Sequence, residues 1–269
     1  MAHQFFAPLT ERRRMTPMFS KPRKALAVAA VALGTAFTAA PALAADEALN
    51  PAQEDAVRAL VREYILDNPE IIAEAIDRLR SKQQAAAEQA QKDAIAAHAE
   101  ALNFDPGSPV MGNPDGDVTL VEFFDYQCGY CKAVFPAVMQ AVEADGNVRL
   151  VMKEFPILGP ASIYASRAAL ASQEQGKYEE FHAAMMELKG ALTEEIVDAT
   201  AQEVGLDLDK LKADMAGAKV DEQISATMSL ARALDIGGTP AFVIGDVLMP
   251  GAVPLERLKA AIEQAREQG

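Results

Sequence analysis

The stretch Val118–Lys132 reads VTLVEFFDYQCGYCK. Its first half is an apolar run rich in Val and Phe, which favours a buried strand, and the residues after the second cysteine are compatible with a helix. Cys128 and Cys131 stand at the junction with C-x-x-C spacing, and they are the only 2 cysteines of the 269-residue chain. We therefore predict a strand that delivers two thiols to the first turn of a helix, and any thiol chemistry of the chain is expected there.

The N-terminal segment has the pattern of an export signal. A basic region that ends at Lys24 precedes the uncharged apolar run 25–40, and Ala42-Leu43-Ala44 follows as a small-x-small cleavage site. This order predicts a secretory signal peptide over residues 1–44 that is cleaved after Ala44. The alternative is an uncleaved anchor, but the alanine-rich run is shorter than the roughly 20 strongly apolar residues that span a bilayer. The expected location is the periplasm, where a dithiol can be held oxidised by dedicated partners.

The charge balance excludes several kinds of partner. The chain has 25 basic and 39 acidic residues, which gives a formal net charge of −14. Removing residues 1–44 removes basic residues almost exclusively, so the mature chain carries a net charge of about −19. Such a surface disfavours nucleic acid and anionic membranes, and no nucleic-acid partner is expected.

Residues 45–103 are predicted to form a helical arm. The segment is rich in Ala, Glu, Gln, Lys and Arg, it lacks glycine, and Pro51 and Pro69 each follow an asparagine, as N-cap and first helical residue would. We expect helices over 51–66 and 69–102. The first helix and the start of the second carry an apolar patch, and the second continues it as a weak alanine-rich heptad seam. This pattern favours homo-oligomerisation through 45–103; a helix packed on its own domain and a solvated linker are the alternatives. The patch comprises Val57, Leu60, Val61, Tyr64, Ile65, Ile71, Ile72 and Ile76.

The remainder, 104–269, is expected to be one α/β domain. The turn-rich segment 104–117 (FDPGSPVMGNPDGD) marks the boundary, and a second strand is predicted over 148–155. Residues 161–234 then read as helices separated by glycines, which predicts an all-helical insert. Strand pattern returns at 241–249, where Gly245-Asp246 suits a hairpin turn, and a terminal helix follows.

The two thiols favour redox chemistry. At a helix start, unpaired backbone N–H groups and the helix dipole favour the thiolate of the first cysteine. Cys128 would therefore be the nucleophile and the more exposed of the two, and Cys131, one turn on and more buried, would resolve the mixed disulfide. A structural staple is one alternative, although so short a loop contributes only about 2 kcal/mol. Metal is another: His98 and His182 lack the spacing that a zinc site needs, whereas two-coordinate Cu(I) would suit two thiolates. No cofactor is expected.

Two separated motifs carry a resemblance to a known family. The run Glu122–Lys132 (EFFDYQCGYCK), together with Gly237-Gly238-Thr239-Pro240, resembles the DsbA-like family of periplasmic thiol–disulfide oxidoreductases. The resemblance extends from about Phe104 to the C-terminus and implies a thioredoxin-like fold interrupted by a helical domain. In the arm, residues 64–70 (YILDNPE) are similar to the suppressor-of-copper-sensitivity C proteins of that family, some of which are oligomeric isomerases.

The resemblance also implies roles for single residues. Cys128 matches the family's nucleophile, Cys131 its resolving cysteine, and Pro240 its cis-proline, which would turn the Thr239 backbone toward a substrate chain. Glu122 stands where the family carries a buried carboxylate that passes protons. The alternatives are an ordinary trans turn at Thr239-Pro240 and a strand-edge position for Glu122. Other expectations concern packing: a solvated Asp125, surface charges at Lys132 and Lys153, and core packing for Tyr178, Phe181, Met185 and Met186.

Gly129-Tyr130 departs from the Pro-His pair of the family's strongest oxidants. Without a histidine at position 130, Cys128 should be less acidic and its disulfide less oxidising, which suits an isomerase. The expected function is a disulfide isomerase or reductase that acts on misfolded exported proteins and is reset by a membrane thiol reductase or oxidase. The alternatives are a dithiol oxidase, a copper-binding or copper-tolerance protein that uses the same thiols, and a holdase chaperone.

Overall fold

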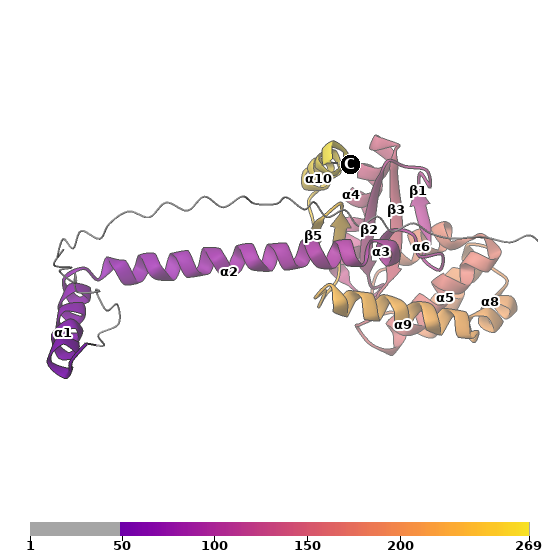
Figure 1. Ribbon diagram of the computed structural model, residues 1–269. Helices are drawn as coiled ribbons and strands as arrows, with labels where there is room; N and C mark the ends of the chain where they lie inside the picture. The colour runs from indigo at the N-terminus through magenta and orange to yellow at the C-terminus, as the bar shows by residue number, and fades with distance from the viewer. Residues whose placement is uncertain (1–48, 269) are drawn as a thin grey trace, which may run out of the picture. The chain divides into compact units, whose positions relative to one another are not determined.

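The structure is a computed structural model that describes residues 49–268 (Figure 1). The predicted signal peptide, residues 1–44, lies outside these residues. The described residues divide into two compact units, with the boundary between residues 63 and 64. No helix in the described part combines the length and apolarity that a membrane crossing would require.

Helix α1 (Pro51–Asp67) confirms the first helix predicted in the arm. Asn50 and Gln53 cap its start reciprocally, because each side-chain oxygen accepts a hydrogen bond from the other residue's backbone N–H at 3.0 Å. None of the 17 residues of α1 is buried. The apolar side chains of this helix therefore find no core within the described part of the chain.

The second predicted helix is divided in two. Helix α2 (Glu70–Ala97) ends where His98 leaves the helical conformation, and α3 (Ala99–Asn103) follows. Asn68 does not cap α2: its Nδ2 donates back to the Tyr64 carbonyl at 2.9 Å. The prediction of one helix to residue 102 was wrong, because the helix is interrupted at His98, between Ile95 and Leu102, which are both buried against the sheet.

The sheet has five strands in the order β1-β3-β2-β4-β5. The strands are β1 (Val110–Gly112), β2 (Val118–Phe124), β3 (Val148–Glu154), β4 (Ala241–Ile244) and β5 (Val247–Pro250). Strands β2 and β3 are parallel, and the other pairs are antiparallel. Strand β1 was not predicted, since 3 residues among prolines and glycines are too few to show a periodic pattern.

Neighbouring residues of β2 pack into two separate cores, one on each face of the sheet. Leu120 and Phe124 pack with α4 (Gly129–Asp145) and the terminal helix α10 (Leu255–Gln268). Val121 and Phe123 pack on the other face with residues from the end of the arm and from α9 (Ala218–Ala233). Figure 1 lets the reader follow this layered arrangement of helices around the sheet.

The helical insertion between β3 and β4 agrees with the expected fold class. It comprises α5 (Pro160–Ser172), a short 3-10 turn (Gln173–Gln175), α6 (Tyr178–Glu187), α7 (Glu194–Glu203), α8 (Leu208–Met215) and α9. Helix α5 lies at the centre of the insertion and contacts each of the other helices. Thr193 and Asp207 cap α7 and α8 through their side chains. The fold is thus a thioredoxin-like sheet with an all-helical insertion, preceded by a helical arm.

Candidate active site

The two cysteines lie at the start of α4, as predicted. Cys128 is the N-cap residue of the helix, and its Sγ accepts a hydrogen bond from the Cys131 N–H at 3.3 Å. Both thiols are free; Cys128 is 5% exposed and Cys131 is 0% exposed. Burial raises the pKa of the Cys131 thiol, and the hydrogen bond with Cys128 and the nearby Glu122 add to this rise. The geometry therefore favours Cys128 as the attacking sulfur.

Thr239 lies directly beside Cys128. The Cys128 thiol donates to the Thr239 carbonyl oxygen at 3.3 Å, and the Thr239–Pro240 peptide bond is cis. Strand β4 begins at the next residue and pairs with β2, with Phe123 opposite Ala241. Pairing of these two strands thus brings together residues that are 111 positions apart in the sequence.

Glu122 is buried in the middle of the sheet. It is 2% exposed, and Met152 of β3 and Phe242 of β4 lie opposite it on the two sides. The strand-edge alternative is therefore wrong. Burial raises the pKa of Glu122 to about 8, so this carboxyl group can exchange a proton near neutral pH.

The prediction that Asp125 is solvated was wrong. The residue is 0% exposed, and its carboxylate accepts four hydrogen bonds: one from the loop before Cys128, two from the segment between β3 and α5, and one from Ser162 at the start of α5. The apolar and polar residues next to Asp125 in the sequence follow no regular pattern. The local sequence therefore did not indicate that Asp125 is buried.

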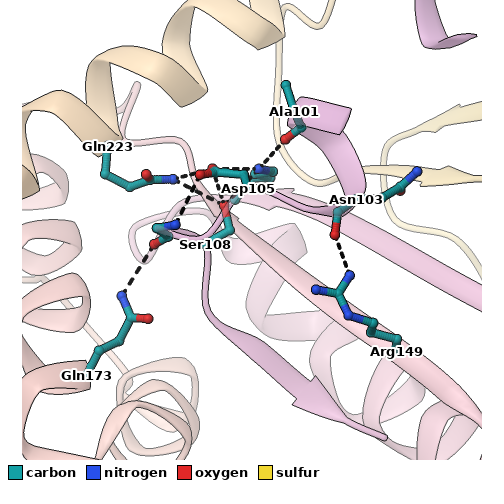
Figure 2. Close-up of polar contacts among 9 residues, drawn as sticks. Ala101, Asn103, Asp105, Ser108, Arg149, Gln173 and Gln223 are labelled. Carbon is teal, nitrogen blue, oxygen red and sulfur yellow. Dashed lines mark hydrogen bonds and ion pairs between the residues drawn. The ribbon is translucent and has the colours of Figure 1, made fainter. Parts of the chain in front are cut away.

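Lys153, expected at the surface, is also buried. It is 1% exposed, and its Nζ donates to the Ala101 carbonyl at 2.6 Å, to Ser108 Oγ at 2.7 Å and to Asp105 Oδ2 at 3.0 Å (Figure 2). Gln223 of α9 donates to the same Asp105 oxygen at 2.6 Å. Burial alone would raise the pKa of Asp105, but the hydrogen bonds from Gln223, Ser108 and Lys153 hold it at about 2. This network joins α3, β3 and α9.

Lys132 is half-buried rather than a free surface charge. Its Nζ donates to the Leu188 carbonyl at 2.8 Å, and burial lowers the pKa of its ammonium group. Beside it, a groove of about 980 Å³ runs from Gln127 and Gly129 toward the loop between α6 and α7. Tyr130, between the two cysteines, is 71% exposed.

Sequence reasoning missed a buried network around Glu154. This carboxyl group accepts hydrogen bonds from the hydroxyl groups of Tyr126 (3.0 Å), Tyr178 (3.0 Å) and Ser166 (2.7 Å). Burial raises the pKa of Glu154 to about 8 although these donors oppose the rise. The Tyr126 hydroxyl also lies 2.9 Å from Nδ1 of His182, whose pKa burial lowers to about 3. The network links the chain just before Cys128 to the insertion.

The burial of Phe181, Met185 and Met186 confirms their predicted core packing. Among residues 49–268, no group of three or more His, Cys, Asp or Glu side chains could hold a metal ion.

Two family models match the chain. The model described as "DSBA-like thioredoxin domain" matches residues 119–263, which include both cysteines and Thr239-Pro240. The model described as "Copper resistance protein ScsC N-terminal domain" matches residues 53–86 of the arm. The first match lies within residues 104–269 and the second within residues 45–103.

Solved structures with similar folds include a thioredoxin-like oxidoreductase from Silicibacter pomeroyi DSS-3. It is 49% identical, with a TM-score of 0.62, and the alignment covers 62% of this chain and 97% of that one. Proteus mirabilis ScsC in a transitional conformation is 33% identical with a TM-score of 0.61, covering 82% of this chain and 100% of that one.

A match among curated proteins is the Na(+)/H(+) antiporter NhaA 1 of Salinispora arenicola. It is 29% identical over 158 residues, which is 58% of this chain. The chain spans only 24% of the length of that antiporter.

Proposed function

Because the chain belongs to the DSBA-like thioredoxin domain family of thiol–disulfide oxidoreductases, we propose that it is a periplasmic disulfide isomerase. Its substrates would be misfolded exported proteins with wrongly paired cysteines. The proposal assigns the chemistry to Cys128 and Cys131, with Thr239, Pro240 and Glu122 around them.

In the first step the Cys128 thiolate attacks one sulfur of a client disulfide. The client S–S bond breaks, a Cys128–client disulfide forms, and the second client sulfur leaves as a thiolate that takes up a proton. The Cys131 N–H, 3.3 Å from Cys128 Sγ, stabilises the attacking thiolate. Isomerisation is complete when another client thiolate attacks the mixed disulfide and releases Cys128.

Cys131 releases Cys128 from the mixed disulfide when no client thiolate does so. Its thiolate attacks Cys128 Sγ, which releases the client with a free thiol and leaves a Cys128–Cys131 disulfide for a membrane partner to reduce. Because burial raises the pKa of Cys131, this thiol needs a nearby proton acceptor. Glu122, whose pKa is about 8, can accept that proton.

The Thr239 backbone is the proposed docking point for the client chain. Its carbonyl oxygen lies 3.3 Å from Cys128 Sγ, and residue 239 is only half-buried. A client strand could pair there through main-chain hydrogen bonds, which do not depend on the client sequence. The sulfur of the paired client would then lie within reach of Cys128.

Gly129 and Tyr130 support a moderate redox potential. Both residues are exposed and neither carries a positive charge that would stabilise the Cys128 thiolate. We expect the reduction potential to lie well below the roughly −120 mV of a strongly oxidising pair.

The observation that carries the isomerase assignment is the apolar surface of the arm. Along α1 and the first half of α2, large apolar side chains are 44–65% exposed within the chain. Self-association through these residues would place several Cys128 sites around one client, which favours repeated exchange over single oxidation. The residues are Val57, Leu60, Val61, Tyr64, Leu66, Ile72, Ile76 and Leu79.

Copper tolerance is the second candidate function, favoured by the description of the family model that matches residues 53–86. Cys128 and Cys131 would supply two thiolate ligands, a number that suits Cu(I). A Cu(I) competition titration of the wild type and of Cys131→Ser separates the candidates. Copper binding would be supported if the wild type binds Cu(I) tightly and shows no isomerase activity, and if Cys131→Ser loses the Cu(I) binding.

Refolding of scrambled ribonuclease with Cys128 and Cys131 variants tests the proposed function. Cys128→Ser should lose activity to background, because no attacking sulfur remains. Cys131→Ser should keep part of the isomerase activity and accumulate mixed disulfides, which gel shifts under non-reducing conditions would detect. Refolding activity that survives Cys128→Ser would instead indicate a chaperone.

A further inference from the structure

Asp125 is the first residue after β2 and stands three positions before Cys128. Its carboxylate is 0% exposed, and four donors satisfy its two oxygens. Oδ1 accepts from the Gln127 N–H at 2.7 Å and from Ser162 Oγ at 2.6 Å. Oδ2 accepts from the Ile157 N–H at 2.8 Å and the Leu158 N–H at 3.0 Å.

These bonds fix the backbone that carries the nucleophile. The Cys128 N–H donates to the Asp125 carbonyl at 3.0 Å, so Asp125 holds the loop through its backbone as well as its side chain. Gln127 Nε2 donates to the Leu158 carbonyl at 3.1 Å and to Ser162 Oγ at 2.8 Å, which joins the same two segments a second time. Asp125 therefore holds the backbone on which Cys128 stands.

All four donors to the Asp125 carboxylate are neutral. Three are backbone N–H groups and one is a hydroxyl, and none of the ion pairs among residues 49–268 includes Asp125. Lys132 is a cation that senses its charge, but the Nζ of Lys132 donates to the Leu188 carbonyl and forms no ion pair with Asp125. The buried acid Glu154 also senses this charge. The site thus contains a buried carboxylate that four hydrogen bonds satisfy and that forms no ion pair among the described residues.

Such a charge opposes a second negative charge nearby. Four hydrogen bonds favour the ionised form of a carboxylate, and like charges in a poorly solvated region repel more strongly than in water. Reduction makes a thiolate available at Cys128, whereas the disulfide is neutral. A fixed negative charge therefore destabilises the reduced form relative to the disulfide, and a pair whose reduced form is less stable has a lower reduction potential.

We propose that Asp125 is a positioning residue that holds the Cys128 loop and, through its charge, lowers the reduction potential of the Cys128–Cys131 pair. This inference rests on the proposed exchange chemistry at Cys128 and does not depend on the isomerase assignment. It also counteracts the stabilisation of the thiolate at the start of α4, which alone would make the pair more oxidising.

Equilibration of the full chain with reduced and oxidised glutathione tests the proposal. Asp125→Asn removes the charge and keeps the size of the side chain, and it should shift the equilibrium toward the reduced pair by about tenfold, which is about 30 mV for a two-electron couple. The rate of Cys128 alkylation by iodoacetamide at pH 6 should rise in the same variant. Asp125→Ser, also uncharged and smaller, provides the same comparison if Asp125→Asn does not fold.

Two further variants separate charge from loop structure. Ser162→Ala removes one donor and retains the charge, so it should lower the melting temperature yet shift the equilibrium by less than about twofold. Asp105→Asn removes a partly buried charge in the Lys153 network and should leave the equilibrium unchanged. Equal shifts in Asp125→Asn and Ser162→Ala, or a shift toward the disulfide, would overturn the proposal. The glutathione equilibration measures the Cys128–Cys131 pair directly. If the variants show the expected shifts but the protein does not refold scrambled ribonuclease, the isomerase assignment is wrong and the role of Asp125 stands.

Discussion

The helical arm and the catalytic region, by which we mean the α/β domain of residues 104–269, differ in how far their apolar side chains are buried. No residue of α1 is buried, and Leu60 at its middle is 65% exposed, whereas in β2 every residue except Thr119 is buried. The first buried side chain along the arm is Ile95, near the end of α2. The comparison teaches that the catalytic region completes its core within one chain, while the arm leaves an apolar surface uncovered within the described residues, as a surface for interaction with another protein would be.

The change from exposed to buried apolar side chains does not occur at the proline- and glycine-rich segment after residue 103. Ile95 and Leu102 pack with Val121 and Phe123 of the sheet, and the Ala101 carbonyl accepts a hydrogen bond from Lys153. The end of the arm is therefore part of the catalytic core in packing terms. Any truncation that is meant to remove only the arm should stop before these residues.

The largest expected effect on stability comes from breaking the junction at Lys153. Lys153→Ala leaves Asp105 without its cation and the Ala101 carbonyl without its donor, so we expect a loss of about 3–5 kcal/mol in the free energy of unfolding. Urea denaturation measures it. Lys92→Ala is the matched control, because the Lys92–Asp246 ion pair is exposed and its loss should change stability far less. Equal effects in the two variants would contradict the importance of the buried network.

An effect of comparable size is expected from pH, through the buried acids of the catalytic region. Glu122 has its ordinary pKa of 4.5 when unfolded and about 8 when folded, so the folded state binds the proton more tightly. Its contribution to stability is present below pH 4.5, decreases between pH 4.5 and pH 8 by up to about 1.4 kcal/mol per unit, and is lost above pH 8.

Glu122→Gln should reduce this pH slope without abolishing it, because Glu154 titrates over the same range. Urea denaturation at pH 5 and at pH 8 provides the measurement, and a slope unchanged by the substitution would show that Glu122 is not the titrating group. The arm offers a contrast, since no acid of α1 is buried.

The sequence allowed the thiol site to be predicted because its signals are local or strongly periodic. The apolar run, the C-x-x-C spacing and the helix that follows are contiguous, and the family motif at Thr239-Pro240 supplied the distant partner. Strand β1 was missed because its pairing with β3, not its composition, makes it a strand.

The burial of charged side chains was the main feature that the sequence did not allow us to predict. Asp125, Lys153 and Glu154 were either assigned to solvent or overlooked, because charged residues are seldom fully buried. Each is compensated by groups distant in sequence, among them Ser162, the Ala101 carbonyl and Tyr178. Only the fold brings these groups together, so no window of sequence around the charge could have revealed its burial.

The most direct test of the central claim is a joint measurement of mass and isomerase activity after deletion of residues 45–86, which ends before Ile95 and Leu102. Sedimentation equilibrium should give an oligomer for the mature chain and a monomer for the deletion variant. The variant should lose at least about tenfold in scrambled-ribonuclease refolding while its oxidation of a dithiol peptide stays within about twofold. An unchanged oligomeric state, or a monomer with full isomerase activity, would contradict the account.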